Sequence, residues 1–409
     1  MMTKHAARSD PRAPLPEHLP YGRQSIDDSD IAAVTQAMRS GVLASGPQLE
    51  AFETAFRDRV GAADAVACSS GTAALQLALM SLELAPGDLC IVPPITFLST
   101  ATAAIHAGLE VAFCDVDPVT GLMGAQSLAD TIATTGRARA ILPVHLGGRL
   151  CAMDQIAALA HEADAVVIED ASHATGGVDS AEVPVGRCAQ SVAATFSFHP
   201  VKTMTTGEGG MVTTATEARG ASIRRLRNHG VTREADRLRE PHSFDDEGAN
   251  NPWTYEQIAL GHNFRMNEMQ AALGLSQMTR LDDFVAKRRA LSAHYIQLLA
   301  PFAPLILTTT PSGDHRLGLH LFSVNIDFAS LKRRRGDVMR AMAAQGVSTQ
   351  VHYIPLYRQP YFIARLGDMR LPGAEAYYSR TLSLPLFAGM ELGDVERVVG
   401  ELVEVLGLR

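Results

Sequence analysis

Short apolar runs alternate regularly with amphipathic segments between residues 65 and 172, and no other property of this chain limits its possible folds as much. The runs read AVACS, LCIVPP, LEVAFCDV, RAILPVHLGG and AVVIEDAS, at residues 65–69, 89–94, 109–116, 139–148 and 165–172. Helical patterns begin at Gly71, after the first run, and near Leu98, after the second. This alternation predicts an α/β fold with a mostly parallel central sheet flanked by helices. Ligands of such sheets bind beyond the carboxyl ends of the strands, so we expect the functional site there.

Three further regions are predicted around this segment. Residues 1–20 contain four prolines and no hydrophobic period, which is typical of a flexible tail, so order is expected to begin near Tyr21. Residues 21–265 are expected to form the large domain, in which the polar stretch 232–252 is an exposed loop. Residues 266–409 are expected to form a smaller α+β domain, with a helix at 267–289, a strand at 320–327 and a helix at 332–344.

Composition narrows the class of partner. The chain has 409 residues, is 46% hydrophobic and carries a net charge of -8, so it is globular and has no basic surplus for nucleic acid or anionic lipid. Small molecules or other proteins are the expected partners. The five cysteines are scattered without C-x-x-C spacing, which indicates reduced core residues and no metal site. No apolar stretch approaches 18 residues, so we expect a cytoplasmic protein that does not cross a membrane.

The segment ATFSFHPVKTMTTGEGG, residues 194–210, places Lys202 between a short β-like run and a glycine-rich turn. A lone lysine is usually a solvated surface group. Here the apolar and glycine neighbours favour a tight, partly buried loop instead. Burial lowers the pKa of a lysine and leaves a free amine that can form an imine with an aldehyde, so Lys202 is a candidate Schiff-base residue.

Two further groups fit a pyridoxal cofactor. Such a cofactor needs an acid that keeps its ring nitrogen protonated, and Asp170, at the end of an apolar run, fits this need. The alternative for Asp170 is a helix N-cap, and the alternative for His173 is a packed core histidine rather than a cofactor contact. A phosphate needs backbone amides at a helix N-terminus, which CSSGTAALQLAL supplies with Ser69, Ser70, Gly71, Thr72 and Ala73.

Two side chains could complete that cofactor site. Ser197, five residues before Lys202, could add a hydroxyl to the phosphate. Phe97, in PITFLST, could stack on the pyridine ring, although by composition alone it would be a core residue.

Seven motifs together resemble one family, the sugar-nucleotide aminotransferases of the DegT type, which have the aspartate-aminotransferase fold (fold type I). The resemblance runs from about Tyr21 to the C-terminus. The motifs, in order, are SSGTAAL at Ser69, ITFLSTA at Ile95, EDASHATGG at Glu169, FSFHPVKTMTTGEGGMVTT at Phe196, RNHG at Arg227, GHNFRMNEMQAALGLSQ at Gly261 and VHYIPLY at Val351.

The resemblance implies roles for these residues. Lys202 would carry the Schiff base of pyridoxal 5′-phosphate and move the proton, while Asp170 would bind the pyridine nitrogen with His173 beside it. Gly71 and Thr72, with Ala73 and Ser197, would bind the phosphate. Phe97 would cover the ring. Asn263, the asparagine of GxNxR, would come from the neighbouring subunit, which implies a homodimer with shared sites.

Within the family, YGRQSID, LGLSQ and QVHYIPLY resemble the aminotransferases of pseudaminic-acid biosynthesis. Those enzymes transfer an amino group from L-glutamate to the 4-keto carbon of a UDP-linked 6-deoxy-2-acetamido sugar. By this likeness the nucleotide sugar would meet side chains at both ends of the chain: Tyr21, Leu43 and Ala44 of the stretch 41–44, His352 and Tyr353. The stretch GVLASG departs from the more polar Trp-Leu-Thr-Gln-Gly found in many of these enzymes.

Other functions remain possible on the same fold, the nearest being an aminotransferase that acts on another nucleotide-linked keto sugar. Two more differ in their chemistry. One is a sugar dehydratase with histidine in place of the lysine, which the presence of Lys202 disfavours. The other is a regulatory or scaffold protein without catalysis, which the joint presence of Lys202, Asp170 and Ser197 disfavours.

Overall fold

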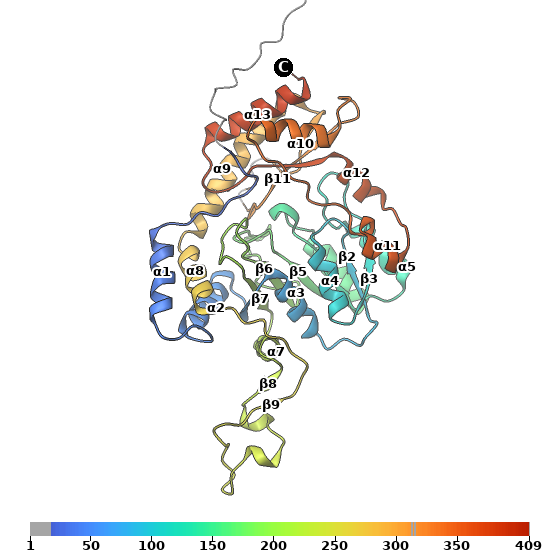
Figure 1. The fold of residues 1–409 in the computed structure, drawn as a ribbon. Coiled ribbons are helices and arrows are strands. Elements are labelled where there is room, and N and C mark those ends of the chain that lie inside the picture. Colours follow the sequence, from blue (N-terminus) through green and yellow to red (C-terminus); the bar gives the residue numbers. More distant parts are fainter. Residues whose placement is uncertain (1–17, 312–313, 315, 409) are drawn as a thin grey trace, which may run out of the picture.

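A seven-stranded sheet lies at the centre of the larger part of the molecule (Figure 1). The computed structural model describes residues 18–311, 314 and 316–408. The strand order is β1 (Asp64–Cys68), β7 (Gly210–Thr214), β6 (Ala193–Ser197), β5 (Val166–Asp170), β4 (Ala140–Ile141), β2 (Leu89–Val92) and β3 (Glu110–Phe113). Strand β7 runs antiparallel to β1 and β6, and the other pairings are parallel. The predicted mostly parallel sheet is therefore confirmed, and β1, β5 and β6 end at the same edge.

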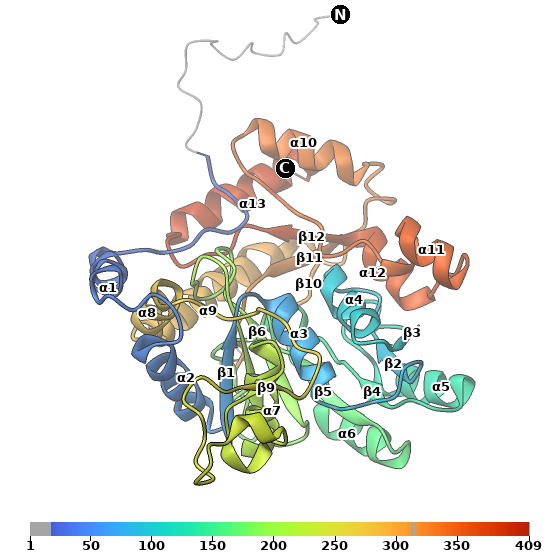
Figure 2. The same ribbon diagram turned by 60° about the horizontal axis from the view of Figure 1, so that its bottom comes forward.

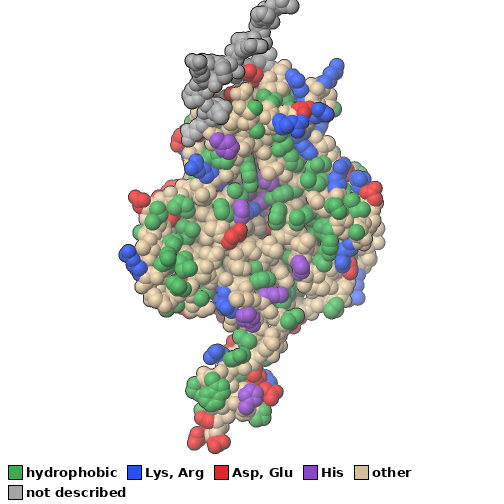
Figure 3. Space-filling view, viewed as in Figure 1, with side chains coloured by type: hydrophobic (Ala, Val, Ile, Leu, Met, Phe, Trp, Pro, Cys, Tyr) green, Lys and Arg blue, Asp and Glu red, His purple; other side chains and the backbone are tan. Residues whose placement is uncertain are grey.

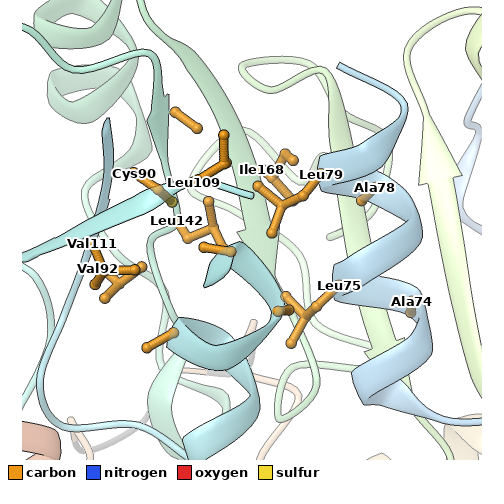
Figure 4. Packing of buried hydrophobic residues seen from close by; sticks show 14 of the residues in the cluster. Ala74, Leu75, Ala78, Leu79, Cys90, Val92, Leu109, Val111, Leu142 and Ile168 are labelled. Atoms are coloured by element: carbon orange, nitrogen blue, oxygen red, sulfur yellow. The ribbon is translucent and has the colours of Figure 1, made fainter. Parts of the chain in front are cut away.

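Helices cover both faces of this sheet. Successive strand residues point to opposite faces, and both sets are apolar here, so each face needs a covering layer. Val66 and Cys68 of β1 belong to the same core as α3 (Gly71–Met80), α4 (Leu98–His106) and α7 (Glu217–Arg227). Leu75 and Leu79 of α3 lie over this face of the sheet (Figure 4). The opposite face is covered by α2 (Pro47–Val60), α5 (Ala125–Thr135) and α6 (Met153–Glu162).

A second core lies beside the carboxyl edge of the sheet (Figure 2). It surrounds a three-stranded antiparallel sheet in the order β10 (Ile306–Thr308), β11 (Phe322–Ile326) and β12 (Thr381–Leu384), packed with α9 (Leu281–Leu299), α10 (Arg335–Ala344) and α13 (Leu392–Leu406). The short 3-10 turn η4 (Ala300–Phe302) follows α9. This part has the α+β character expected of the C-terminal region.

The two cores exchange segments, so their packing does not follow one cut in the sequence. Helix α8 (Glu268–Met278) packs against α1 (Asp28–Arg39) and α2. The turn η5 (Leu356–Arg358) and the helices α11 (Pro360–Leu366) and α12 (Pro372–Arg380) bury side chains in the core of the large sheet. The boundary after residue 265 stays a prediction. We propose that the C-terminal core itself begins within α9.

Most of the predicted N-terminal tail, residues 1–17, lies outside the described residues. The expectation is wrong for its last part. Leu19 is buried in the second core, where its amide donates to Gly346 O at 2.8 Å and its carbonyl accepts from Ser348 N at 2.9 Å. Order therefore begins before Tyr21, because an apolar side chain has a core to enter.

The expected single helix at 267–289 is also wrong. The chain breaks between α8, which ends at Met278, and α9, which begins at Leu281. Arg280 pairs with Asp27 at 2.9 Å and with the buried Asp30. This bend lets α8 pack on the large domain while α9 enters the second core. The helix expected at 332–344 starts at Arg335, since Lys332 has a positive φ of 52°.

The polar stretch predicted as an exposed loop forms an arm that stands away from the body of the molecule (Figure 1). Its base is the two-stranded pairing of β8 (Val231–Thr232) with β9 (Glu256–Gln257), and it contains the 3-10 turns η2 (Ala235–Arg237) and η3 (Pro241–Ser243). The carboxylate of Glu256 accepts hydrogen bonds from the Arg239 and Glu240 amides and from Ser243, which orders the arm. Across the described part of the chain, no helix is long and apolar enough to cross a membrane.

Candidate active site

A cavity of about 810 Å³ lies at the carboxyl edge of the large sheet, where the two cores meet. Its walls come from the segments that follow β1, β2, β5 and β6 and from residues 350–354 of the C-terminal region. The face shown in Figure 3 is hollowed near its centre, and histidine side chains gather there. The cavity therefore stands where the alternation of strands and helices predicted a site.

The structure brings together most of the residues singled out from the sequence. Those that line the cavity are Tyr21, Ser69, Ser70, Gly71, Thr72, Phe97, Asp170, His173, Ser197, Lys202, His352 and Tyr353. Ala73, Leu43, Ala44 and Asn263 are not among its lining residues. Residues from six different segments of the chain thus converge on one space.

Lys202 lies in the loop between β6 and β7, which is held by main-chain contacts. Its amide donates to His199 O at 2.9 Å, and the Thr205 hydroxyl donates to Phe198 O at 2.9 Å. Arg288 of α9, which is 1% exposed, donates a hydrogen bond of 3.4 Å to the Lys202 carbonyl. Desolvation lowers the pKa of Lys202 to about 8, against the opposing effect of the Asp170 charge. The surface interpretation of this lysine is wrong.

Asp170 ends β5 and is 4% exposed. Its Oδ2 accepts a hydrogen bond from Thr100 Oγ1 at 2.8 Å, and its Oδ1 accepts one from the Ser172 amide at 3.2 Å. No helix begins at residues 171–177, which form turns, so the N-cap interpretation is wrong. The carboxylate is instead a buried anion at the cavity wall.

His173 is both a buried residue and a cavity residue. Its Nδ1 accepts from the Gly147 amide at 3.2 Å, so in the neutral ring Nε2 carries the proton and faces Tyr353 Oη at 3.3 Å. Burial lowers the pKa of His173 and of its neighbour His320 well below the usual value, and lowers that of His352 to about 3. These rings are therefore neutral at pH 7.

Helix α3 starts directly at the cavity. Ser70 is its N-cap, and the Ser70 side chain accepts from the Ala73 amide at 3.1 Å. Gly71 and Thr72, the first helical residues, line the cavity, while Ala73 is buried behind them. A Cβ on Gly71 would lie 2.7 Å from the Cβ of Ser197, so glycine allows the helix start and the end of β6 to meet.

Three of the predicted residues lie on the surface outside the cavity of their own chain. Leu43 and Ala44 are exposed, and the carbonyl of Leu43 accepts from the Glu268 amide at 3.1 Å. Asn263 is also exposed, but its segment touches the cavity wall, because the carbonyl of Phe264 accepts from the Ser69 amide at 2.8 Å.

Some cavity residues were not predicted from the sequence. His320, Thr96, Ser172, Glu208, Gln350 and Gln359 are among them. The ring of His320 lies 4.6 Å from that of His173, although 147 residues separate the two in sequence, so no local pattern joins them. Thr100 contacts Asp170 from α4, 70 residues away in sequence, and no local pattern marks this contact.

Comparison with known proteins agrees with this geometry. The model of the DegT/DnrJ/EryC1/StrS aminotransferase family matches residues 24–403. The spore coat polysaccharide biosynthesis protein SpsC of Bacillus subtilis is 36% identical over 384 residues, which cover 93% of this chain and 95% of SpsC.

Solved structures of similar proteins superpose over almost the whole chain. Helicobacter pylori PseC, described as an aminotransferase involved in the biosynthesis of pseudoaminic acid, matches with a TM-score of 0.87 and 25% identity, covering 96% of this chain and all of PseC. The sugar aminotransferase Spr1654 of Streptococcus pneumoniae, in a PLP form, matches with a TM-score of 0.85 and 25% identity over 96% of this chain and 99% of its own. The enzyme class predicted from the motifs is confirmed, and the chain belongs to the DegT/DnrJ/EryC1/StrS aminotransferase family.

Proposed function

We propose that this sugar aminotransferase moves the amino group of L-glutamate to the keto carbon, C4, of a UDP-linked 4-keto-6-deoxy-2-acetamido sugar, and so makes an amino-sugar precursor of pseudaminic acid. The observation that carries the transfer is the convergence of Lys202, with its pKa lowered to about 8, and the buried carboxylate of Asp170 on one cavity. The choice of sugar rests on the likeness to PseC.

The cofactor is pyridoxal 5′-phosphate, and the cavity has a partner for each of its ends. Lys202 would hold its aldehyde carbon and Asp170 its ring nitrogen. The amides of Gly71 and Thr72, at the start of α3, and the hydroxyl of Ser197 would hold its phosphate. When bound, the cofactor supplies an electron sink for the carbanion formed at the amino carbon.

The protein's own groups orient the reactants and move the proton. Lys202 Nζ, as a free amine, can take a proton and return it, because its pKa of about 8 is close to neutral pH. Asp170, held by two hydrogen bonds, would supply a fixed negative charge to the ring nitrogen. His173 is neutral, so it can pack beside the ring without adding a charge that would compete with the ring proton.

The sugar would enter from the side of the C-terminal region. Tyr21, His352 and Tyr353 form an aromatic group there, with the rings of Tyr21 and His352 5.7 Å apart and those of Phe97 and Tyr353 6.2 Å apart. Phe97 is 55% exposed, so an apolar face is open to a ligand at the cavity. Aromatic rings with polar tips suit both a nucleobase and a sugar.

A homodimer would complete the site. The exposed Asn263 lies on a segment bonded to the phosphate-binding turn of its own chain, so a twofold partner would bring its own copy of this segment to the interface. Leu43 and Ala44 stay predictions for the sugar contact. We place the reaction in the cytoplasm, because all five cysteines are free and buried, as is usual in a reducing compartment.

Two measurements test this function. Purified protein with L-glutamate should convert one member of a panel of UDP- and dTDP-linked 3-keto and 4-keto sugars to an amino sugar, read by mass spectrometry, with 2-oxoglutarate formed in equal amount. A product that has lost water without gaining nitrogen would point to a dehydratase instead.

Lys202→Ala is the matched control for this assay. We expect it to fold with an unchanged melting temperature, to show no visible absorption from a Schiff base, and to have no turnover, because the amine is gone. Borohydride should fix the cofactor of the wild type on the peptide that carries Lys202. Fixation on another lysine, or a colourless wild-type protein in excess cofactor, would exclude the assignment.

A further inference from the structure

Two buried threonine hydroxyls form a chain that ends on the carboxylate of Asp170. Thr100 Oγ1 lies 2.8 Å from Asp170 Oδ2 and 2.7 Å from Thr96 Oγ1. Thr100 is 0% exposed and Thr96 is 2% exposed. An ionised carboxylate can only accept, so Thr100 donates to Asp170 and accepts from Thr96. The hydroxyl protons therefore all point toward the carboxylate.

The start of α4 sets this arrangement. Thr96 precedes the helix by two residues and Thr100 is its third residue, and the chain turns at the helix start so that the two hydroxyl oxygens lie 2.7 Å apart. Phe97, between them, lines the cavity. Ala101, Ala103 and Ala104 pack in the core and fix the helix against the sheet. The hydroxyl of Thr100 is thus held by a rigid element.

Both oxygens of Asp170 are tethered, and by different segments. Thr100 donates to Oδ2 from α4, and the Ser172 amide donates to Oδ1 from the turn after β5. Hydrogen bonds to a carboxylate stabilise its charged form and fix its rotamer, which offsets the cost of burying the charge. Thr100 itself is not among the lining residues of the cavity, so it can act on a ligand only through Asp170.

We propose that Thr100, supported by Thr96, is a positioning residue that holds the carboxylate of Asp170 in one orientation, aimed at the ring nitrogen of the cofactor. This inference rests on the proposed function. It gives the motif ITFLSTA a second role. Besides the ring contact expected of Phe97, the motif would orient the acid that binds the ring nitrogen.

Thr100→Val tests the proposal, because valine keeps the shape of threonine and removes the donor. We expect the dissociation constant of pyridoxal 5′-phosphate, measured by titrating the cofactor-free protein, to rise roughly tenfold, as is typical for loss of a hydrogen bond to a charged group. The visible circular dichroism of the bound cofactor should change, since the ring loses its fixed partner. Turnover should fall while the KM for L-glutamate stays within about threefold, since the tether acts on the cofactor.

Three further variants make the result decisive. Thr100→Ser keeps the donor and should restore both cofactor affinity and the circular dichroism. Thr96→Val removes only the supporting hydroxyl and should have a smaller effect of the same kind. Thr102→Val removes a hydroxyl from the same helix that donates to Leu98 O at 3.1 Å, away from Asp170, and should leave all readouts unchanged.

Wild-type cofactor affinity and circular dichroism in Thr100→Val would overturn the proposal, and so would equal losses in the valine and serine variants. If Thr100→Val does not fold, the serine and Thr96 variants give the same test. A wild-type protein that binds no pyridoxal phosphate would refute the proposed function itself, whereas binding that requires Lys202 but ignores Thr100 would refute this inference alone.

Discussion

At the scale of single residues, the chemistry of the cavity rests on Lys202 and Asp170, whereas the other charged lining residue, Glu208, is exposed. Four histidines line the cavity, and burial keeps three of them, His173, His320 and His352, neutral by lowering their pKa values. Burial acts on Lys202 in the same sense and brings its pKa to about 8, which makes the free amine available near neutral pH. Desolvation thus has two effects: it favours the free amine of Lys202, and it keeps the buried histidine rings uncharged.

The first prediction concerns the titration of Lys202. In the cofactor-free protein, its amine should react with a methylating reagent with a midpoint near pH 8, because deprotonation occurs at its lowered pKa rather than at the usual 10.5. Peptide mass spectrometry after labelling over a pH series measures this, with the exposed Lys332 as internal reference. Labelling of both lysines along the same curve would show that Lys202 is not desolvated.

The second prediction concerns Asp170→Asn. An amide cannot hold the proton on the ring nitrogen, so the variant should bind cofactor but lose turnover by roughly 10²- to 10³-fold, the range found when one preorganised electrostatic group is removed. Cofactor titration and steady-state kinetics separate the two effects. Turnover within a few-fold of wild type would assign the carboxylate a purely structural role.

At the scale of elements, the site is built from strand ends and the turns that follow them. β1, β5 and β6 deliver the turn before α3, Asp170 and Ser197 to one edge of the sheet. The packing there is so close that a side chain at position 71 would have no room beside Ser197, and only glycine fits. The junction of α3 with β6 is therefore sensitive to one added methyl group.

The third prediction follows for Gly71→Ala. The added Cβ would stand 2.7 Å from the Cβ of Ser197, so α3 must shift away from β6, at a cost of about 1–3 kcal/mol in the free energy of unfolding and with weaker cofactor binding. Chemical denaturation and cofactor titration measure both. Gly393→Ala in α13 is the control, since its Cβ would have no atom within 4 Å. Equal behaviour of the two variants would show that the contact has no effect.

At the scale of the whole molecule, two cores enclose one cavity, and Asn263 lies exposed outside it. The loop at residues 350–354 and His320 reach the cavity from the C-terminal region, while Asn263 lies on the surface of the large domain. Folding of a single chain therefore forms the lysine and carboxylate side of the site. The shared-site proposal assigns the rest to dimerisation.

The last prediction tests that sharing. Lys202→Ala and Asn263→Asp homodimers should each be impaired, the first without the amine and the second repelling the phosphate by like charge. In a mixed dimer, one site would carry both defects and the other neither. Differently tagged chains, co-expressed and purified as mixed dimers, should therefore recover roughly half of wild-type activity, an estimate that follows from twofold symmetry. Mixed dimers as inactive as their parents would show that Asn263 acts within its own chain.

The sequence alone determined the parallel sheet and the strand ends at which the site stands, because both depend on local order. Alternating apolar runs specify strands and helices, and a polar residue at the end of an apolar run, such as Asp170, must emerge at the sheet edge. The motifs around Lys202 and Gly71 are continuous in sequence, so their residues were found together.

Only the tertiary structure decided what joins distant segments. The break between α8 and α9 depends on the pairing of Arg280 with Asp27 and Asp30, some 250 residues earlier, which no helical period reveals. Likewise Thr100 reads as one more residue of α4, and its hydrogen bond to Asp170 exists only because the packed core brings α4 to the end of β5. Local periodicity determines which face of its own helix or strand a side chain lies on. The residue that this side chain contacts is determined by the packing of helices and strands that lie far apart in the sequence.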